Sequence, residues 1–577
     1  MRSFGAVGDG VTDDAKAIDD AEASAAASGK QVYAPAGTYL LGTTSPDADS
    51  HYAYITPKSG VSIYGDGIDR TIFKIKAGEN ARFAGTTGPN VIATKSAAPL
   101  SNATFSDFTV DWNGANNLLT ALDTARNNAA IFSLNGGINI LVERVKVRTT
   151  PGNQCIFFPA FAAGGGQKNI TIRDCVFEDN GSGLTGNYNA DHSSVYCNGS
   201  NLLYEGNRFS SSGPMVNGAA WEIHGSNSIA QGNTIDNYVL GMWIASNYEA
   251  ISDIDIHDNH ATNISAAFSI SAGVEAVNNV KVHHNTFKQA TGLSYGATTY
   301  FVNGNTIVSC DRLAIYDNEF IGQGYTNQFF MQHYKIAELR LSGNKIKNFW
   351  KGLTGSGLDI GGSKVADSIH VAGNEWNDVA QAIYFNNPTL AVTSFEVLGN
   401  QFVRSASDSV APVTLSASSS AGNISGNDFS TNYTTLLAGT MNGAKFVHYK
   451  EGTWTPAIVG GTTAGTGTYT KQEGQYTWRG NRVEFNATIT WTAHTGTGQI
   501  WVSLPVVPVN AGTATQMVAL GVENITLTAG KFPVAMVVTT VGLALLYEQQ
   551  SAGAMGVLTL GAAGTVYVSG TYTVSPP

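Results

Sequence analysis

Two residues in the stretch "AAWEIHGSN" can carry acid–base chemistry, Glu222 and His224. They are separated by one residue, so in a β-strand they would project from one face, opposite Trp221 and Ile223. Glycoside hydrolysis needs two carboxyl groups, roughly 5 Å apart for retention and roughly 6.5–9.5 Å apart for inversion. We therefore predict Glu222 as one catalytic carboxyl group. A plain solvated strand face is the competing interpretation.

The second carboxyl group is expected on a neighbouring segment. "DHSSVYCNGSN" precedes the Glu222 strand and supplies Asp191, and "GMWIASNYEAISD" follows it and supplies Glu249. Aromatic and polar residues around these carboxyls form the mixture that a sugar-binding groove uses, because aromatic faces stack on pyranose rings. The predicted substrate-binding residues are His224, His192, Tyr196, Trp243, Asp253, His333, Asp359 and Tyr384.

A second set of polar residues leaves another chemistry open. Lys281, His283 and Tyr316 would suit a lyase, which needs a base beside a uronic acid. The histidines of "HDNH" and "VHHN" could suggest a metal, but consecutive strand residues point to opposite faces and the ligands would diverge. We expect no metal site and no cofactor.

An Asn recurs at intervals of 26 to 33 residues and positions these candidates in a repeat. Apolar residues lie five and three residues before it, as at Leu339 and Leu341, and another lies two residues after it. Alternation with period two indicates strands rather than helices. Gly, Asp or His directly precedes the Asn, which suits a tight turn. The repeated positions are Asn207, Asn233, Asn259, Asn285, Asn318, Asn344, Asn374, Asn400 and Asn427.

Such a repeat cannot bury its apolar side chains alone, so the repeats must stack. A parallel β-helix with one coil per repeat fits this length, and the recurring Asn would form an inward ladder of side-chain amides. Leucine-rich repeats would carry a helical or Leu-rich segment, which is not seen, and a propeller blade needs about 40 or more residues. Neighbouring coils lie about 4.8 Å apart, so carboxyl groups on adjacent coils would meet the spacing for hydrolysis.

Composition agrees with a long all-β chain. The 577 residues include 65 Gly, and only 13% are charged. The net charge is −11 and no Lys/Arg run appears, so a nucleic-acid partner is not expected. No signal-peptide pattern and no apolar run of membrane-spanning length is seen, so no membrane association is expected. The four cysteines form no CxxC pair and are predicted to be buried free thiols.

Both ends of the chain differ from the repeats. Residues 1–45 contain an Ala-rich helix after Asp14 that would cap the open end of the β-helix. Residues 46–445 form the predicted β-helix. Residues 446–577 alternate Thr, aromatic and β-branched residues, which predicts an antiparallel β-sandwich. Trp454, Trp478, Trp491 and Trp501 in this part could stack on sugars, although core or subunit-interface positions are favoured.

The opening "FGAVGDGVTDDAKAI…VYAPAGTYLL" resembles the pectate-lyase-like superfamily of right-handed β-helices, which includes bacteriophage tailspikes and capsule depolymerases. The stretch "EGTWTP…SLP" resembles the C-terminal β-domain of phage tail fibres and tailspikes. The resemblance implies a homotrimer held together through the C-terminal domain, with carbohydrate binding as a further role there. It also implies a virion protein, assembled in the host cytoplasm, that attaches to a phage tail or adaptor through an N-terminal region absent here.

The expected function is therefore binding and hydrolysis of a bacterial capsule or O-antigen polysaccharide. Three alternatives remain open: a polysaccharide lyase, a non-catalytic receptor-binding fibre of the same fold, and a free extracellular bacterial enzyme.

Overall fold

The chain divides into two compact units, each considered by itself. Unit 1 comprises residues 1–396, 400–422 and 428–443, and unit 2 comprises residues 397–399, 423–427 and 444–577. The computed structural model describes residues 1–46, 52–79, 90–94, 99–117, 130–134, 136–150, 154–158, 167–181, 193–212, 218–272, 275–291, 300–325, 329–349, 358–360, 368–385, 394–407, 409–415, 422–439, 445–447, 449–507, 516–538 and 542–574.

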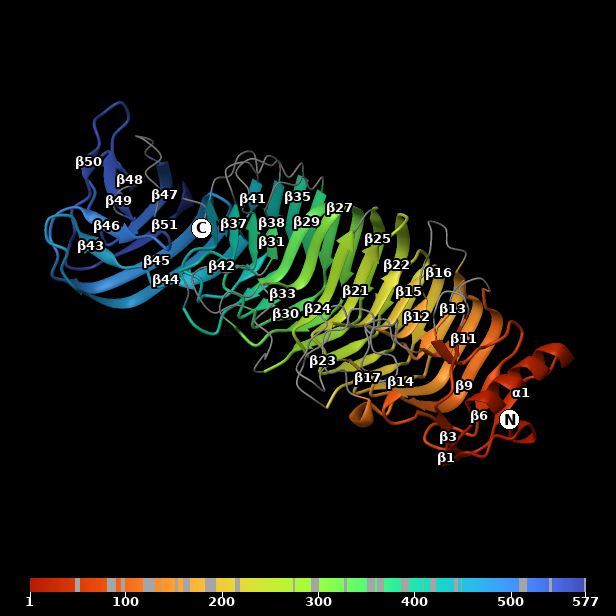
Figure 1. Cartoon of the computed structure of the whole chain (residues 1–577). Helices are drawn as coiled ribbons and strands as arrows, with labels where there is room; N and C mark the ends of the chain where they lie inside the picture. Colours follow the sequence, from red (N-terminus) through yellow and green to blue (C-terminus); the bar gives the residue numbers. More distant parts are fainter. Residues whose placement is uncertain are drawn as a thin grey trace. The chain divides into compact units, whose positions relative to one another are not determined.

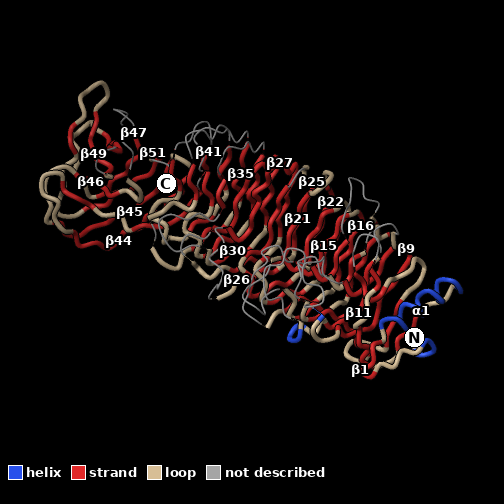
Figure 2. The backbone as a smooth tube through the Cα atoms, in the orientation of Figure 1, coloured by secondary structure: helices blue, strands red, loops and turns tan. Residues whose placement is uncertain are grey.

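Unit 1 is a parallel β-solenoid, and short strands joined by turns are its main elements (Figures 1 and 2). Each complete turn, or coil, contributes one strand to each of three parallel sheets, in the chain order sheet 1, sheet 2, sheet 3. The long strands β9 (Ser101–Asp111) and β11 (Ile138–Arg148) pass from sheet 2 into sheet 3, and β27 (Tyr300–Tyr316) and β29 (Phe329–Ser342) pass from sheet 1 into sheet 2.

Sheet 1 further contains β5 (Tyr52–Ile55), β8 (Asn90–Ala93), β10 (Phe132–Ser133), β12 (Gln154–Phe158), β15 (Ser193–Asn198), β18 (Ala219–His224), β21 (Leu240–Ser246), β24 (Ala266–Ala272), β31 (Leu358–Ile360), β34 (Ile383–Phe385), β37 (Val413–Leu415) and β40 (Leu437–Gly439), with β4 (Ser45–Pro46) antiparallel to β5. Sheet 2 contains β2 (Val32–Ala34), β6 (Ile63–Gly65), β13 (Lys168–Arg173), β16 (Ser200–Glu205), β19 (Ser228–Gln231), β22 (Ile251–His257), β25 (Val277–His283), β32 (Ser368–Ala372) and β35 (Ser394–Leu398). Sheet 3 contains β1 (Asp9–Asp13), β3 (Gly37–Leu41), β7 (Thr71–Ile75), β14 (Val176–Glu178), β17 (Arg208–Ser210), β20 (Thr234–Asp236), β23 (His260–Ile264), β26 (Thr286–Gln289), β28 (Glu319–Ile321), β30 (Lys345–Lys347), β33 (Glu375–Asn377), β36 (Gln401–Val403) and β39 (Asp428–Phe429).

The predicted ladder of side-chain amides runs between sheets 2 and 3. At Asn318, the Nδ2 group donates to Oδ1 of Asn344 at 3.0 Å and to the carbonyl of Val282 at 2.8 Å. The Asn318 Oδ1 atom accepts from both the backbone N–H and the Nδ2 group of Asn285. From Asn207 onward the recurring Asn therefore satisfies buried backbone groups at the bend between these sheets, which confirms the predicted ladder.

The residue directly before each ladder Asn adopts a left-handed backbone. The φ angle is 64° at Gly232, 55° at Asp258, 54° at His284 and 65° at Gly343. Glycine adopts this conformation without penalty, and Asp, Asn and His tolerate it better than other residues. The narrow choice of residues before the Asn thus reflects one sharp turn repeated in every coil.

The core of unit 1 follows the period-two pattern. Ile256, Val282 and Leu341 of sheet 2 are at most 1% exposed, and so is Trp376 of sheet 3. All four cysteines are buried free thiols, as predicted, and burial raises the pKa of Cys155 to about 12. The thiols are therefore inert packing groups.

A helix, α1 (Ala15–Ser28), lies near the chain start, and two short 3₁₀ helices span Arg2–Phe4 and Gly114–Asn116 (Figure 2). Ile18 and Ala25 of α1 are buried, and Gly29 ends the helix with φ of 65° and an N–H bonded to the Ala25 carbonyl. Within the described ranges, no helix is long and apolar enough to cross a membrane.

Unit 2 contains a ten-stranded antiparallel sheet in the order β42-β44-β45-β51-β47-β48-β49-β46-β43, with β50 beside β49. A separate parallel pair in this part of the chain is β38 (Gly422–Ser425) with β41 (Lys445–Val447). The sheet strands are β42 (Tyr449–Trp454), β43 (Ile458–Gly460), β44 (Gly467–Arg479), β45 (Arg482–His494), β46 (Ile500–Ser503), β47 (Gln516–Glu523), β48 (Phe532–Val538), β49 (Leu543–Gln549), β50 (Gly556–Val557) and β51 (Gly564–Thr573).

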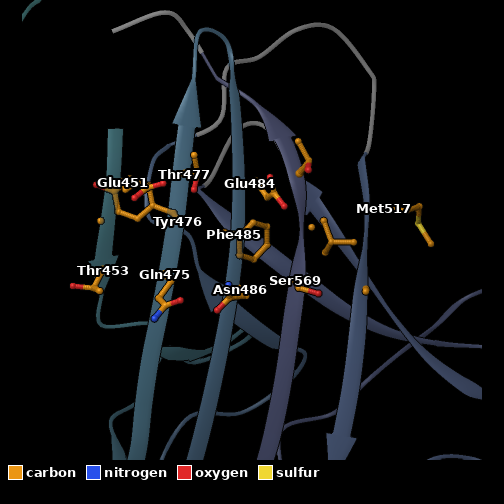
Figure 3. A pocket seen from close by; sticks show the side chains of 15 residues that line it. Glu451, Thr453, Gln475, Tyr476, Thr477, Glu484, Phe485, Asn486, Met517 and Ser569 are labelled. Atoms are coloured by element: carbon orange, nitrogen blue, oxygen red, sulfur yellow. The ribbon is translucent and has the colours of Figure 1, made fainter. Parts of the chain in front are cut away.

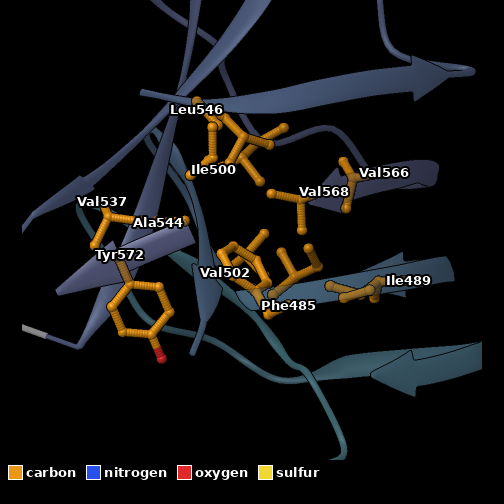
Figure 4. Packing of buried hydrophobic residues seen from close by; sticks show 14 of the residues in the cluster. Phe485, Ile489, Ile500, Val502, Val537, Ala544, Leu546, Val566, Val568 and Tyr572 are labelled. Atoms are coloured by element: carbon orange, nitrogen blue, oxygen red, sulfur yellow. The ribbon is translucent and has the colours of Figure 1, made fainter. Parts of the chain in front are cut away.

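Alternate residues of these strands build one apolar core (Figure 4). Phe485 and Ile489 of β45 pack with Val502 of β46 and with Leu546 of β49. Trp491 is 1% exposed in this core, so its ring is unavailable to a sugar. Trp454 and Trp478 are partly buried against the same core.

Candidate active site on sheet 1

Strand pairing brings several predicted site residues into one straight row across sheet 1. Tyr196 of β15 pairs with Glu222 of β18, and Glu222 pairs with Trp243 of β21. The same register continues through Ser269 of β24 to Asn303 of β27. Because strands in one sheet are about 4.8 Å apart, each side chain neighbours the next. We call these positions the Glu222 row.

The Glu222 row extends further in both directions. Backwards from Tyr196 it contains Phe157 and Ser133, which are half-buried. Forwards from Asn303 it passes through backbone positions 332 and 359 to Tyr384, which is half-buried. Tyr196, Trp243, Asp359 and Tyr384 thus share the Glu222 register, although the Asp359 side chain lies outside the described residues.

Glu222 itself is more enclosed than a solvated strand residue. It is 5% exposed, and His224 is 6% exposed. Their flanking residues Trp221 and Ile223 are fully buried, as the alternation along β18 requires. The Tyr204 hydroxyl donates to the backbone carbonyl of Glu222 at 3.1 Å and fixes this part of β18 from within.

A short hydrogen bond joins the two ionisable side chains. Nε2 of His224 lies 2.8 Å from Oε2 of Glu222, and Nδ1 of His224 lies 2.8 Å from the carbonyl oxygen of Ala245. A carbonyl oxygen only accepts, so Nδ1 carries a hydrogen. The contact between Nε2 and Oε2 needs a second hydrogen, held by the imidazole or by the carboxyl group. The Glu222–His224 pair therefore has no net charge and holds one transferable proton.

Tyr196 lies beside this pair. Its ring centroid is 4.4 Å from that of His224, and its hydroxyl oxygen accepts a hydrogen bond from Nδ2 of Asn247 at 2.6 Å. Burial, with the nearby Glu222 carboxyl adding to it, raises the pKa of Tyr196 to about 12. Tyr196 is thus a protonated phenol that can donate a hydrogen bond, and it is poorly suited to act as a base.

Two aromatic residues offer surfaces near the pair. Trp243 is half-buried, and its indole N–H donates to the hydroxyl of Ser271 on β24, which fixes the plane of the ring. Tyr248 follows β21 and is 49% exposed. Sequence analysis did not select Asn247, Tyr248, Ser269, Ser271 or Asn303, because the strand boundary after Ser246 and the coil-to-coil register were needed to position them.

The predicted partner carboxyls do not contact Glu222 in the described part of the chain. Glu249 is exposed in the turn three residues after β21 ends, and no hydrogen bond or ion pair involving it occurs among the described residues. Asp191 and His192 lie outside the described residues. Oε1 of Glu222 has no hydrogen-bond partner within the described ranges.

Two other predicted residues are displaced from the Glu222 row. Asp253 is on β22 of sheet 2, because the chain leaves sheet 1 after Ser246, so placing it beside Glu222 was wrong. His333 of β29 is in backbone register with Ile360, one position beyond the Glu222 row, and its side chain lies outside the described residues. Among the described residues, no group of three or more His, Cys, Asp or Glu side chains is placed to hold a metal ion.

A hollow of about 930 Å³ lies on the sheet of unit 2 (Figure 3). Two rows of mostly polar residues in register line it. The first row contains Thr453, Gln475, Asn486 and Ser569, and the second contains Glu451, Thr477, Glu484 and Thr571. Glu451 and Glu484 are separated by the intervening strand β44, so these carboxyls do not form a close pair.

Comparison with known proteins identifies the start of the chain. A family model described as "Rhamnogalacturonase A/epimerase, pectate lyase-like" matches residues 1–208. This confirms the resemblance seen in the opening motif.

Curated relatives match about a third of the chain. Mannuronan C5-epimerase AlgE1 of Azotobacter vinelandii is 33% identical over 209 residues, which are 36% of this chain and 14% of that protein. AlgE4 of the same organism is 31% identical over 210 residues, which are 36% of this chain and 34% of that protein. Alginate lyase 7 of Azotobacter vinelandii is 32% identical over 194 residues, which are 31% of this chain and 20% of that protein. The chain therefore spans between a seventh and a third of the length of these relatives.

Solved structures show the same fold along the whole chain. A double mutant of the tailspike protein of E. coli bacteriophage HK620 superposes with a TM-score of 0.57 at 13% identity, covering 98% of this chain and 91% of that one. A single mutant of that tailspike in complex with a pentasaccharide gives a TM-score of 0.54 at 14% identity, with the same coverage. The pectate-lyase-like start and the tailspike fold thus occur together in one chain.

Proposed function

We propose that this chain is a phage tailspike that binds a bacterial capsule or O-antigen polysaccharide along the Glu222 row and hydrolyses it at Glu222. The observation that carries the proposal is the Glu222–His224 pair, which holds a transferable proton in a row flanked by Tyr196 and Trp243. The tailspike fold, and the pentasaccharide bound by one protein of that fold, support a saccharide as the ligand.

In this mechanism Glu222 acts as the general acid. Its Oε1 atom is free of partners in the described part of the chain and would approach the glycosidic oxygen. Oε1 would take up a proton from solvent and give it to the glycosidic oxygen as the bond from that oxygen to the anomeric carbon breaks, while the hydrogen shared with His224 stays at Oε2 and offsets the charge of the carboxylate that forms. Tyr196 would donate a hydrogen bond to a sugar oxygen, and Trp243 would stack on an adjacent ring. Asp191 or Glu249 would be the second carboxyl group, with His192 as a further contact.

The remaining parts of the chain complete the proposal. Helix α1 would cap a right-handed coil, and the unit 2 sheet would fold as a sandwich that holds a homotrimer together and contributes sugar contacts. Asp359, Tyr384 and His333 would contact more distant sugars. The protein would act as a virion component at the bacterial surface, attached to the phage tail.

A second candidate function is β-elimination or C5-epimerisation of a uronate polysaccharide. The names of the relatives that match about a third of the chain favour it, as does the absence of a second carboxyl beside Glu222 among the described residues. The free Oε1 atom of Glu222 would then take the proton from the sugar carbon, and Tyr196 would be the proton donor. A free extracellular enzyme of this class would use the same residues.

The test is incubation of the purified chain with a panel of capsular and O-antigen polysaccharides and with alginate. Hydrolysis shortens the polymer and creates reducing ends without the ultraviolet absorbance of an unsaturated sugar, whereas elimination produces that absorbance. Epimerisation changes the NMR spectrum of alginate without shortening it. Glu222→Gln should lower the rate about 100-fold or more, while the matched control Glu375→Gln, a half-buried carboxyl on sheet 3, should not.

Cleavage by Glu222→Gln at the wild-type rate would remove the proposed site. Binding without any reaction of the wild-type protein across the panel would instead support a receptor-binding fibre.

A further inference from the structure

A second feature of unit 1 lies on sheet 2, away from the Glu222 row. Its starting point is a ladder of exposed asparagine amides that the sequence repeat did not reveal. Nδ2 of Asn139 donates to Oδ1 of Asn102, Nδ2 of Asn169 donates to Oδ1 of Asn139, and Nδ2 of Asn201 donates to Oδ1 of Asn169, at 2.7–2.8 Å. All four residues have φ angles between 54° and 58°.

This outer ladder is interrupted at the next coil. Asn227 has the same left-handed backbone, with φ of 54°, and is exposed. In the described part of the chain its side-chain amide has no hydrogen-bond partner, whereas Asn279 two coils further on donates to Oδ1 of Asp253. The Asn227 amide is therefore a free donor and acceptor at the position where the ladder fails.

A hollow of about 240 Å³ lies at the interruption. Two short rows of side chains form it, from β22, β25, β19 and the residue directly before β19. The first row contains Asn227, Asp253 and Asn279, and the second contains Ile229, Asp255 and Lys281. Coils are about 4.8 Å apart and alternate residues about 6.6 Å apart along a strand, so the two rows frame an area close to that of one sugar ring.

The floor of the hollow is partly apolar. Ile229 is a large aliphatic residue that remains 39% exposed. An exposed apolar side chain surrounded by hydrogen-bonding groups matches the two sides of a pyranose, because the C–H face of the ring contacts apolar surface while its hydroxyls bind the polar rim. A volume below the roughly 300 Å³ of small-molecule pockets limits the hollow to one ring.

The charges of the hollow select among sugars. Asp253 and Asp255 face a single cation, Lys281, which forms no ion pair with any described residue. Hydrogen bonds from Asn279 and Ser252 lower the pKa of Asp253, and Oδ1 of Asp255 is bonded to Nε2 of His283 at 2.8 Å. The excess of carboxylates over cations repels an anionic sugar, whereas the carboxylate oxygens can accept protons from neutral hydroxyls.

We propose that this hollow is a second saccharide-binding site that takes one neutral sugar ring. Ile229 supports the apolar face of the ring, and Asn227, Asp255 and Lys281 bind its hydroxyls. His283 has a positioning role, because its ring is stacked between His257 at 5.0 Å and Tyr316 at 4.6 Å and fixes the Asp255 carboxylate. The site is independent of the proposed cleavage, since it shares no residue with the Glu222 row.

The test is saturation-transfer difference NMR on the intact wild-type chain with three probes: methyl α-L-rhamnopyranoside, methyl α-D-glucopyranoside and methyl glucuronopyranoside. We expect transfer to at least one neutral glycoside and little to the glucuronide. Ile229→Ala and Lys281→Met should each lower the affinity for the neutral glycoside about fivefold. Lys345→Met, at an exposed lysine of sheet 3, is the matched control and should not.

Trp243→Ala distinguishes the two sites. If the transfer is lost in Trp243→Ala and kept in Ile229→Ala, the sugar is bound on the Glu222 row and the proposal is overturned. No transfer to either neutral glycoside, or stronger transfer to the glucuronide, would also overturn it. None of these outcomes depends on whether Glu222 cleaves a polymer.

Discussion

Glu222 and His224 show how one residue pair can combine burial with proton transfer. A buried lone carboxylate would be costly, but the hydrogen bond to His224 leaves the pair neutral overall. His224 is held in turn by the Ala245 carbonyl on the next coil. The geometry therefore assigns His224 to the same chemical unit as Glu222 rather than to an independent contact with substrate.

Replacement of both residues of the pair tests this coupling. His224→Gln should lower kcat about 100-fold with little change in KM, because it removes the proton that the pair shares. Adding Glu222→Gln should cost little more than either change alone, because residues that act as a unit are non-additive. The measurement is the rate of polymer shortening in a double-mutant cycle. If the fold-loss in kcat of the double variant equals the product of the two single losses, the two residues act separately.

At the level of the elements, the bends between strands carry the polar interactions of the solenoid. Each ladder Asn between sheets 2 and 3 satisfies backbone carbonyls and also the amide of the previous ladder residue, all within a buried environment. Removing one amide leaves buried groups on two coils unpaired, and each such group costs about 1–3 kcal/mol.

Asn318→Ala should therefore lower the free energy of unfolding by about 2–4 kcal/mol. The comparison is Asn377→Ala, at a half-buried position of β33 without a side-chain hydrogen bond among the described residues, which should change it by less than about 1 kcal/mol. Urea unfolding followed by circular dichroism measures both. Equal losses in the two variants would show that the ladder adds no stability beyond general packing.

Helix α1 contains a buried carboxyl group, Glu22, that makes the stability of the fold depend on pH. Burial, with the nearby Asp19 adding to it, raises the pKa of Glu22 from 4.5 to about 8, although the Lys58 N–H donates to Oε2. The folded state then binds a proton more tightly than the unfolded state, so stability falls as pH rises from about 4.5 to about 8.

Glu22→Gln should abolish this dependence. The variant should melt at a higher temperature than the wild type at pH 8 and at a similar temperature near pH 5, because a neutral amide has no proton to lose. Asp20→Asn, at an exposed position of the same helix, is the control. The difference between its melting temperature and that of the wild type should be the same at pH 8 and pH 5. A variant that is less stable than the wild type at pH 8 would mean that the Glu22 side chain is stabilising in its ionised form.

At the level of the whole molecule, unit 2 leaves several large apolar side chains exposed. The exposed fraction is 71% for Val507, 56% for Met517, 55% for Val557 and 50% for Phe532. Single exposed apolar residues are common, and strand pairing among the described residues does not join these four into one patch, so their exposure alone does not require an assembly. The proposed homotrimer would cover these residues.

Light scattering coupled to size-exclusion chromatography checks the assembly. The intact chain should elute with three times its mass of 60.6 kDa. Val507→Asp combined with Met517→Asp should shift the protein toward monomer if the exposed residues of unit 2 form the interface. A wild-type protein with the mass of one chain would contradict the trimer.

The sequence by itself determined the repeated coil. Regular spacing of Asn233, Asn259 and Asn285, with alternating apolar neighbours, leaves few ways to bury the side chains other than stacking, so the solenoid, the amide ladder and the buried thiols were predictable. The common register of Tyr196 and Glu222 was also predictable, because they are 26 residues apart, as are the ladder residues Asn207 and Asn233 of their coils. Trp243 follows Glu222 by only 21 residues, so its place in the row was not predictable from the repeat period.

Only the tertiary structure decided how side chains meet. The chain leaves sheet 1 after Ser246, which moves Asp253 to another sheet and leaves Glu249 in an exposed turn. The hydrogen bonds of His224 and the hollow at Asn227 depend on contacts between coils at distances of a few ångströms. A repeat period states which residues occupy equivalent positions, but it does not specify the bends between strands, and these bends decide which side chains touch.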